Sequence, residues 1–303
     1  GIMLKKLAIL SVAIGISGIA FAGGGELALK EAAKSKIESA ISKKITNTAK
    51  SYLPSIEISG INFDASASQF EMFLVQPLID DEVNGKAVFF QGSLISQDHR
   101  NTANLGIGAR KIADDGKRIF GINAFYDQEF KYDHKRVSLG GEYLTSVGDL
   151  RVNKYWAISN SLTTRHGIET ALDGYDLEFS LPIPFMPSTR YAAKLFNWSG
   201  TGSNVDIEGE VHSIIIKMPF GTHNLILEAG KKHFDASSIL DEEFFRFSYL
   251  INLGSVKPKP MNLFSEQAFN LTEIKDRRFE KVRRTNTIVK ETSSNNQVIV
   301  SGY

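Results

Sequence analysis

The stretch Ala87–Thr145 decides the fold, and it reads AVFFQGSLISQDHRNTANLGIGARKIADDGKRIFGINAFYDQEFKYDHKRVSLGGEYLT. Within it, apolar residues recur at every second position, as in Leu105, Ile107 and Ala109, which glycine or polar residues separate. The same alternation runs through residues 136–143, and neither segment has a helical period. Because successive side chains of a strand point to opposite faces, each segment has one apolar face and one polar face. The polar faces carry arginine, glutamate and asparagine, which favours a barrel with a lipid-facing exterior and a polar interior.

The composition is compatible with such a barrel and excludes several other classes of protein. The chain has 303 residues, of which 42% are hydrophobic, and it contains no cysteine. The lack of cysteine excludes a disulfide framework and a thiolate metal site. Lys plus Arg number 35 against 34 for Asp plus Glu, and a net charge of +1 gives no electrostatic footprint for nucleic acid. A barrel is compatible with this ordinary hydrophobic content, because only alternate residues of its strands need to be apolar.

The first residues have the pattern of an export signal. Lys5 and Lys6 form a charged region, Leu7–Ile19 is apolar, and Ala20-Phe21-Ala22 has small residues where a signal peptidase cleaves. We therefore predict a secretory signal peptide over residues 3–22. The alternative is a membrane anchor, for which the apolar region is short.

Residues 23–52 are predicted to form a helical lead-in on the periplasmic side of the outer membrane. Within them, Glu26–Lys50 has a weak apolar stripe at helical spacing, and lysines cover the remaining positions. The alternative is a helix that lies on an anionic membrane surface.

Regularly spaced strands follow within residues 53–254. About twelve strands of about ten residues each match the even number and the length that tilted membrane strands require. The predicted fold is all-β: a twelve-stranded antiparallel transmembrane β-barrel with a helical linker in the lumen and a short N-terminal periplasmic helix. The predicted strands are Ser55–Asn62, Gln69–Pro77, Ala87–Ile95, Thr102–Ile112, Arg118–Asp127, Arg136–Thr145, Asp149–Ile158, Gly174–Pro182, Thr189–Trp198, Glu208–Met218, His223–Lys232 and Glu243–Leu253.

The alternation also assigns side chains to the lumen. In the last strand Phe245 and Phe247 share one face, and an arginine lies on the other. An arginine on a lipid-facing surface costs about 2–4 kcal/mol at the membrane midplane, so the polar face must point inward. One strand departs from the rule, because Lys154 shares a face with apolar neighbours. The predicted lumen-facing residues are Asn104, Arg110, Asn123, Arg136, Glu142, Asp176, Glu178 and Arg246.

Connection lengths predict the orientation of the barrel. Barrels of this kind have short periplasmic turns and longer outer loops. With the amino terminus in the periplasm, the outer connections include Ser159–Asp173, and the inner ones include the short Ser146–Gly148. The inner connection Leu78–Lys86 is longer than this rule favours.

Residues 255–291 are predicted to form a linker that crosses the lumen. Asn262–Asn286 is compatible with a helix but has no clean apolar stripe, so it suits water or a polar lumen. As a helix, Phe264–Arg283 would be about 30 Å long, close to the height of a membrane barrel. A barrel of about twelve strands is wide enough to need such a plug. The linker residues expected in the lumen are Arg277, Arg278, Arg283, Arg284 and Asn286, with Glu142, Asp176 and Glu178 as ion-pair partners for the arginines.

Three segments of the chain resemble a known family. NTANLGIGAR, IFGINAFYDQEF and KRVSLGGEYL, in this order and spacing, are similar to the translocator barrel of inverse autotransporters, the intimin and invasin family. Gly174-Tyr175-Asp176-Leu177, followed by Leu181-Pro182, resembles another segment of that family. The stretch Arg278–Glu291 resembles the end of the family's linker, although Arg283 and Lys290 depart from its pattern.

The resemblance implies a function and a set of partners. Members of the family anchor in the bacterial outer membrane, pass a linker outward through the barrel and display a carboxy-terminal passenger linked to adhesion. We expect residues 292–303 to form a short surface tail, with the passenger truncated or absent here. The implied partners are outer-membrane lipid, the barrel assembly machinery, periplasmic chaperones and a host or surface ligand of the missing passenger. The alternatives are a plugged or open porin, or a barrel whose outer loops bind a partner directly.

The sequence does not predict an enzyme, a cofactor or a metal site. Outer-membrane phospholipases are also twelve-stranded barrels, and they need a serine and a histidine within hydrogen-bond reach. His212 and Ser213 are adjacent in a predicted strand and must therefore point to opposite faces. The glycines at Gly106, Gly108 and Gly140 lie inside strands with no helix after them, so they indicate close backbone approach rather than a phosphate loop.

Overall fold

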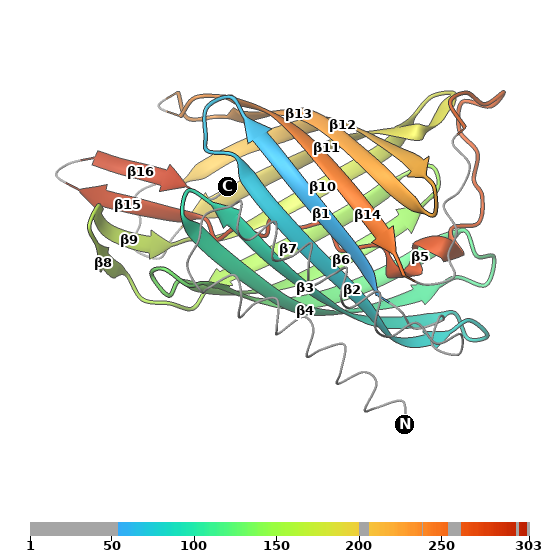
Figure 1. Ribbon diagram of the computed structural model, residues 1–303, viewed down its shortest axis with the longest axis horizontal. Coiled ribbons are helices and arrows are strands. Elements are labelled where there is room, and N and C mark those ends of the chain that lie inside the picture. Colours follow the sequence, from blue (N-terminus) through green and yellow to red (C-terminus); the bar gives the residue numbers. More distant parts are fainter. Residues whose placement is uncertain (1–53, 200–205, 238, 254–261, 295–296, 302–303) are drawn as a thin grey trace.

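Twelve antiparallel strands close on themselves to form a barrel (Figure 1). The structure is a computed structural model, and it describes residues 54–199, 206–237, 239–253, 262–294 and 297–301. The strand order around the barrel is β1-β14-β13-β12-β11-β10-β7-β6-β5-β4-β3-β2, so the twelve-stranded antiparallel barrel predicted from the sequence is confirmed. The strands are β1 Ser55–Phe63, β2 Gln69–Asp81, β3 Lys86–Gln97, β4 Arg100–Ile112, β5 Arg118–Glu129, β6 Lys135–Thr145, β7 Asp149–Ala157, β10 Asp173–Ile183, β11 Met186–Ser199, β12 Ile207–Phe220, β13 His223–Phe234 and β14 Glu242–Asn252.

The two faces of the wall differ in polarity as the alternation predicted. Leu105, Ile122 and Phe247 point outward with 53%, 70% and 47% of their surface exposed, whereas Asn104 and Arg136 point inward and are fully buried. Apolar side chains on this scale are stable on an outer surface when lipid covers them. The wall is therefore built for a membrane outside and a polar filling inside.

Lys154 lies on the outward face, as the alternation required. Its neighbours Arg151 and Asn153 in β7 are buried in the lumen, so the register of this strand is regular. The Lys154 Nζ lies 5.9 Å from the centroid of the Tyr175 ring. A lysine beside a tyrosine can extend its ammonium group toward the polar edge of a membrane.

The two ends of the barrel differ in the length of their connections. One end, which we name the short-turn end, has connections such as 82–85, 146–148 and 184–185. The other, the long-loop end, carries the connection of residues 158–172 between β7 and β10. The long inner connection expected at Leu78–Lys86 is wrong: β2 continues past a bulge after Pro77, and a turn with Gly85 at φ +59° joins it directly to β3.

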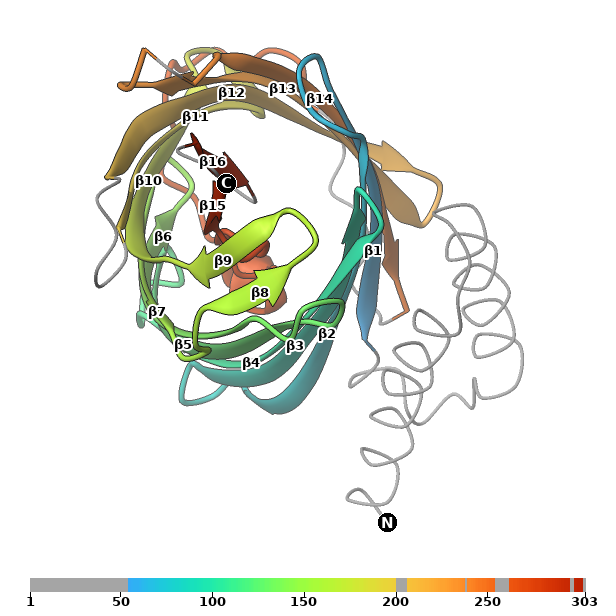
Figure 2. The ribbon, with the colours of Figure 1, turned by 90° about the vertical axis from the view of Figure 1, so that its left-hand side faces the viewer.

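A second sheet, absent from the sequence prediction, forms at the long-loop end. Its order is β16-β15-β9-β8, from β8 Leu162–Thr164, β9 Gly167–Ala171, β15 Lys290–Ser294 and β16 Gln297–Ser301. Seen from this end, the sheet lies within the outline of the barrel (Figure 2). The sequence suggested only a loop at Ser159–Asp173, because the hydrogen-bonding partner of β9 is β15, which comes far later in the chain.

The prediction of a helical linker is wrong. Across residues 262–289 the structure contains one short 3₁₀ helix, η2 Lys275–Phe279, and otherwise irregular or extended chain. In an α-helix the backbone groups bond to one another, whereas here lumen side chains take them: the Val282 N–H donates to Gln91 Oε1 at 2.7 Å. An extended chain rises about 3.3 Å per residue, so fewer residues are needed to cross the barrel than in a helix.

The predicted signal peptide over 3–22 and the whole of the predicted lead-in helix over 23–52 lie outside the described residues, which begin at 54. Among the described residues, no helix has both the length and the apolar character to cross a membrane.

Candidate functional site in the barrel lumen

The linker passes through the barrel from the short-turn end to the long-loop end. Outside the short-turn end, the Phe185 N–H donates to the Ala268 carbonyl at 3.1 Å, and at the mouth the Ile274 N–H donates to the Gly116 carbonyl at 2.8 Å. At the other end the Leu172 N–H donates to the Val289 carbonyl at 2.9 Å. Residues 274–289 therefore occupy the lumen over its whole height.

An apolar cluster closes the short-turn mouth around the linker. Ile274 is 2% exposed and packs against side chains from β3, β4, β5 and β6. These are Ala87, Ile112, Ile119 and Leu144, with Phe279 packed beside them. Burial of these apolar side chains removes them from water, which stabilises the linker in its position inside the lumen.

Two arginines of η2 fix the linker at this mouth. Arg277 makes a bidentate pair with Asp149, with Nη1···Oδ1 at 3.0 Å and Nη2···Oδ2 at 2.8 Å, and its Nε lies 2.7 Å from Glu280. Arg278 makes a second bidentate pair with Asp80, at 2.8 and 2.9 Å, and also reaches Glu82. Bidentate arginine–carboxylate pairs fix geometry as well as charge, so the linker has a defined position where it enters.

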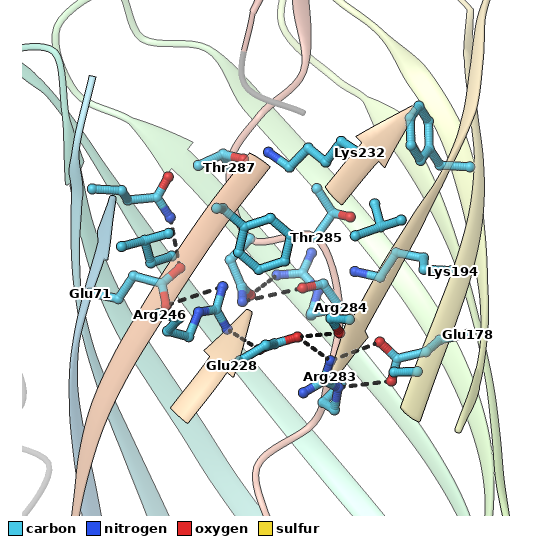
Figure 3. Close-up of a pocket in the computed structure, with 18 of the residues that line it drawn as sticks. Glu71, Glu178, Lys194, Glu228, Lys232, Arg246, Arg283, Arg284, Thr285 and Thr287 are labelled. Atoms are coloured by element: carbon cyan, nitrogen blue, oxygen red, sulfur yellow. Dashed lines mark hydrogen bonds and ion pairs between the residues drawn. The ribbon is translucent and has the colours of Figure 1, made fainter. Parts of the chain in front are cut away.

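Further into the lumen, Arg283 lies between two wall carboxylates (Figure 3). Its Nε is 2.8 Å from Glu178 of β10, and its Nη2 is 3.3 Å from Glu228 of β13. Arg246 of β14 pairs with Glu228 from the other side at 3.6 Å, and with Glu71 at 3.8 Å. One linker arginine thereby connects two strands of the wall, β10 and β13, that are separated by β11 and β12.

Arg284 is the most deeply buried cation of the linker. Its guanidinium makes two bonds to Asp127, at 2.7 and 2.8 Å, and Arg136 of β6 donates to the same carboxylate at 2.8 Å. All three side chains are fully buried. The Phe125 ring lies 4.4 Å from the guanidinium, and only glycine fits at Gly106, where a Cβ would come within 2.3 Å of that ring.

At the long-loop end the linker becomes strand β15 and joins the β8–β9 hairpin. Ile288 and Val289 are fully buried, and Lys290 pairs with Ala171 in register. The Lys290 Nζ lies 2.5 Å from Glu129, and both side chains are almost completely buried. The end of the linker is therefore held by strand pairing and by one buried ion pair.

Glu129, His134 and Glu169 form a compact cluster beside Lys290. Their potential ligand atoms all lie within 4.8 Å of one another, a spacing at which a metal ion could be held. Cations of the chain already occupy this cluster, because Arg100 pairs with both glutamates and Lys290 with Glu129. The geometry is therefore that of an ion-pair network.

Two titratable groups of this cluster lie outside the barrel strands. Burial lowers the pKa of His134 below its ordinary value of 6.5, although the hydrogen bond to Glu169 at 3.1 Å opposes the shift. Burial alone would raise the pKa of Glu169, but Arg100 and His134 hold it below its ordinary value. At neutral pH the cluster thus contains an uncharged histidine beside an ionised carboxylate.

All of the residues that the sequence assigned to the lumen point into it. Asn104, Arg110, Asn123, Arg136, Glu142, Asp176 and Glu178 are buried, and Arg246 is partly buried. Among the expected linker residues, Arg277, Arg278, Arg283 and Arg284 make wall contacts, and Asn286 contributes its carbonyl to Asn104 at 2.9 Å.

The expected pairing of the arginines with three acids is correct for one of them. Glu178 pairs with Arg283. Glu142 instead pairs with Arg110 of the wall at 2.6 Å, and Asp176 accepts a hydrogen bond from the Thr285 hydroxyl at 2.9 Å. The linker arginines reach other acids because the extended chain places them at heights that a helix would not.

Sequence reasoning missed several residues that hold the linker. They are Glu57, Asp80, Asp127, Glu129, Asp149 and Glu228 of the wall, and Glu280, Lys281 and Lys290 of the linker. The alternation of side chains along β5 could have found two of them. Asp127 and Glu129 lie on the same face of this strand as Asn123, which the sequence assigned to the lumen.

The adjacent His212 and Ser213 point to opposite faces, as predicted. Ser213 is buried and donates to Glu228 in the lumen at 2.8 Å, whereas His212 is on the outer face, 2.5 Å from the Tyr191 hydroxyl. This pair cannot form a serine–histidine couple.

Cavities lie beside the linker in the described part of the chain. One of about 140 Å³ lies against Lys281–Thr287 and is lined by Glu178, Glu228 and Arg246 (Figure 3). Another, of about 570 Å³, opens at the long-loop end around Arg100, Glu169 and Lys290. Space of this size next to buried charges suits bound water.

The chain is similar to known outer-membrane proteins. A family model described as "Inverse autotransporter, beta-domain" matches residues 22–212. The intimin of Escherichia coli O127:H6 is 33% identical over 150 residues, which are 48% of this chain and 15% of that protein. The intimin of Citrobacter freundii is 32% identical over 150 residues, with the same coverage. The matched region is therefore a small part of each intimin.

The fold is also similar to a solved structure, reported as "Unveiling the Mechanism Behind the in-meso Crystallization of Membrane Proteins". The two structures have a TM-score of 0.64 at 19% sequence identity, covering 79% of this chain and 99% of the other. At this identity the likeness concerns the fold alone.

Proposed function

Because this chain belongs to the inverse autotransporter family, we propose that its barrel exports a carboxy-terminal passenger through the lumen and holds it at the cell surface. The protein is a β-barrel of the bacterial outer membrane, in the family that contains the intimins. One observation carries the proposal: the linker runs through the lumen and reaches the far end of the barrel before the chain forms β15 and β16.

The proposal includes an orientation. We assign the short-turn end to the periplasm and the long-loop end to the outside, since short periplasmic turns and longer outer loops are usual in such barrels. Both Ser55 at the start of β1 and Asn252 at the end of β14 then lie on the periplasmic side, since these two residues pair with each other. Only a pass through the lumen can bring the following chain outside.

The same proposal names partners. Lipid of the outer membrane covers the apolar outward face. Insertion would require the barrel assembly machinery and periplasmic chaperones, and any adhesion ligand would be bound by the passenger. These partners are supported by membership of the family, whereas the filled lumen argues against an open porin as the resting state.

An epitope tag after Tyr303 tests the proposal. If the barrel is a translocator, antibody should label the tag on intact cells. A second tag, inserted in the short turn between Val147 and Gly148, serves as the control and should be labelled only after the outer membrane is permeabilised. A carboxy-terminal tag that is also labelled only after permeabilisation would favour a plugged porin with an unexported tail.

A further inference from the structure

Several wall side chains bind the linker by its main chain and not by its side chains. Gln91 of β3 makes two such bonds to Val282, accepting from its N–H at 2.7 Å and donating to its carbonyl at 3.4 Å. Asn104 of β4 donates to the Asn286 carbonyl at 2.9 Å, and Arg136 of β6 donates to the Thr285 carbonyl at 2.7 Å. The wall thus offers polar groups to an extended backbone.

The same kind of contact recurs along the linker. Arg110 of β4 donates through Nη1 to the carbonyls of residues 277, 278 and 280, at 3.3, 3.0 and 2.6 Å. Asn153 of β7 donates to the Arg283 carbonyl at 3.3 Å, and the Tyr155 hydroxyl accepts from the Thr285 N–H at 2.8 Å. These six side chains, which we name the backbone track, belong to β3, β4, β6 and β7.

Most of the backbone track is held in place by the wall itself. Asp127 accepts hydrogen bonds from Asn104 at 2.6 Å and from Arg136 at 2.8 Å. Asp176 likewise accepts from Asn153 at 2.7 Å and from Tyr155 at 2.6 Å. Hydrogen bonds within the wall thereby orient four of the six side chains toward the linker, and such orientation lowers the entropy cost of binding.

The residues bound by the track differ widely in their side chains. They include the apolar Val282, the polar Thr285 and Asn286, and the charged Arg283. Contacts to backbone groups do not depend on side-chain identity. An extended chain inside a barrel otherwise has amide groups without partners, and each buried unpaired group is costly.

We propose that the backbone track binds the main chain of an extended polypeptide, whatever its side chains, as that polypeptide passes through the lumen. This inference rests on the proposed export function. The ion pairs of Arg283 with Glu178 and Glu228 have the second role of fixing the resident linker in register once export ends.

The test compares export of two extensions fused after Tyr303 in the full-length protein. One is an uncharged repeat of glycine, serine, threonine and asparagine, the other has arginine at intervals, and both end in an epitope tag. The rate at which each tag becomes accessible on intact cells is measured by pulse labelling. We expect the two wild-type rates to agree within about twofold.

The wall variant Gln91→Leu/Asn104→Leu should slow both extensions by about tenfold, the factor that corresponds to one or two lost hydrogen bonds. The matched control is Asn197→Leu, a half-buried amide that bonds Glu208 outside the lumen and should leave both rates unchanged. Assembly of each variant is checked by heat-modifiability, and Gln91→Leu alone is used if the double variant does not assemble. By contrast, Glu178→Gln/Glu228→Gln should leave the rate of the uncharged extension unchanged, because these acids pair with arginine side chains and not with the main chain.

Two outcomes would overturn the inference: an uncharged extension that is exported far more slowly than the charged one, or Gln91→Leu/Asn104→Leu with unchanged rates for both. No tag at the surface of wild-type cells would instead refute the proposed function. The track would then be tested by its contacts with the resident linker. The variant Gln91→Leu/Asn104→Leu weakens these contacts, so it should raise the open probability of the full-length barrel in planar bilayers by about tenfold. An unchanged open probability would contradict it.

Discussion

The linker is held by different forces at the two ends of the barrel. At the short-turn end, side-chain charge does most of the work, through bidentate pairs of Arg277 with Asp149 and Arg278 with Asp80 above an apolar seal. At the long-loop end the backbone itself pairs, as β15 adds to β9, and Lys290 supplies one buried ion pair. The arginine pairs select a particular sequence, whereas the strand pairing of β15 with β9 accepts many.

If the barrel exports a chain as proposed, this difference allows the lumen both to pass that chain and to retain the linker. Strand pairing at the long-loop end can form with whichever segment leaves the lumen, since its hydrogen bonds come from the backbone. The arginine pairs at the short-turn end can form only when the linker's own sequence arrives. We therefore expect damage to the two ends to have different consequences.

The largest effect, on channel conductance, should come from deleting the linker, which removes its contacts at both ends of the barrel. Deletion of residues 262–303 leaves a wide barrel with nothing in its lumen, and single-channel recordings in planar bilayers should change from brief openings to a steady open current. Deletion of residues 292–303 alone is the control and should leave the channel closed. A closed channel after the longer deletion would contradict a plugging role for the linker.

Breaking the short-turn end should be the next largest effect. Asp149 is buried and faces Arg277, Arg151 and Arg190, so Asp149→Asn leaves several buried cations with less compensation. We expect a loss of about 3–5 kcal/mol in the free energy of unfolding, measured by urea titration in lipid vesicles.

The control for this substitution is Asp115→Asn, which removes an exposed acid near the same end that pairs with Arg118. Such exposed pairs contribute about 0–1 kcal/mol, so the control should be near wild type. Equal losses in the free energy of unfolding for the two variants would contradict a stabilising role for the buried ion pairs of Asp149.

Breaking the long-loop end should cost less and act locally. Glu129→Gln removes the carboxylate that faces Lys290, while Arg100 keeps its pair with Glu169. We expect about 1–3 kcal/mol of local destabilisation, enough to release β15 from β9 without unfolding the barrel. In Glu129→Gln, a nitroxide attached at Ser293→Cys should become more mobile in its electron paramagnetic resonance spectrum. The control is Asp133→Asn on the neighbouring loop, which should leave that spectrum unchanged.

The smallest effect should be a pH dependence of the same contact. Because the pKa of His134 lies below 6.5 when β15 is docked on β9, the state with β15 released takes up a proton first as the pH falls. Docking is therefore fully stable above about pH 6.5 and weakens as the pH decreases below that value, and Glu169 adds a further loss at more acidic pH.

The measurement is the mobility of the nitroxide at Ser293→Cys between pH 7.5 and 5.5. His134→Gln should abolish the change over this range. A pH response that persists in His134→Gln would assign it to another group.

The barrel wall was predictable because its information is local. Alternation along each strand fixed the twelve strands and the inward side of residues such as Asn104 and Glu178, and neither depends on distant partners. Even Lys154, a charged residue among apolar ones, lies on the outward face that the alternation along β7 requires.

The filling of the lumen was less predictable because its partners are distant in the sequence. The linker has residues compatible with a helix, but Gln91 and Arg110, far earlier in the chain, take the backbone groups that a helix would use. The β8–β9 hairpin likewise depends on β15. Ion pairing followed the same rule, since the choice of Asp127 for Arg284 depends on how far an extended chain rises per residue.

The central claim is that the linker crosses the membrane through the lumen, from the periplasm to the outside. Because the chain has no cysteine, single substitutions can report the position of each end. Gln267→Cys lies beside the short-turn end, Ser293→Cys lies in β15, and both side chains are exposed. A membrane-impermeant maleimide should label Ser293→Cys on intact cells, and Gln267→Cys only after permeabilisation. Labelling of Gln267→Cys on intact cells, or failure to label Ser293→Cys there, would contradict the account.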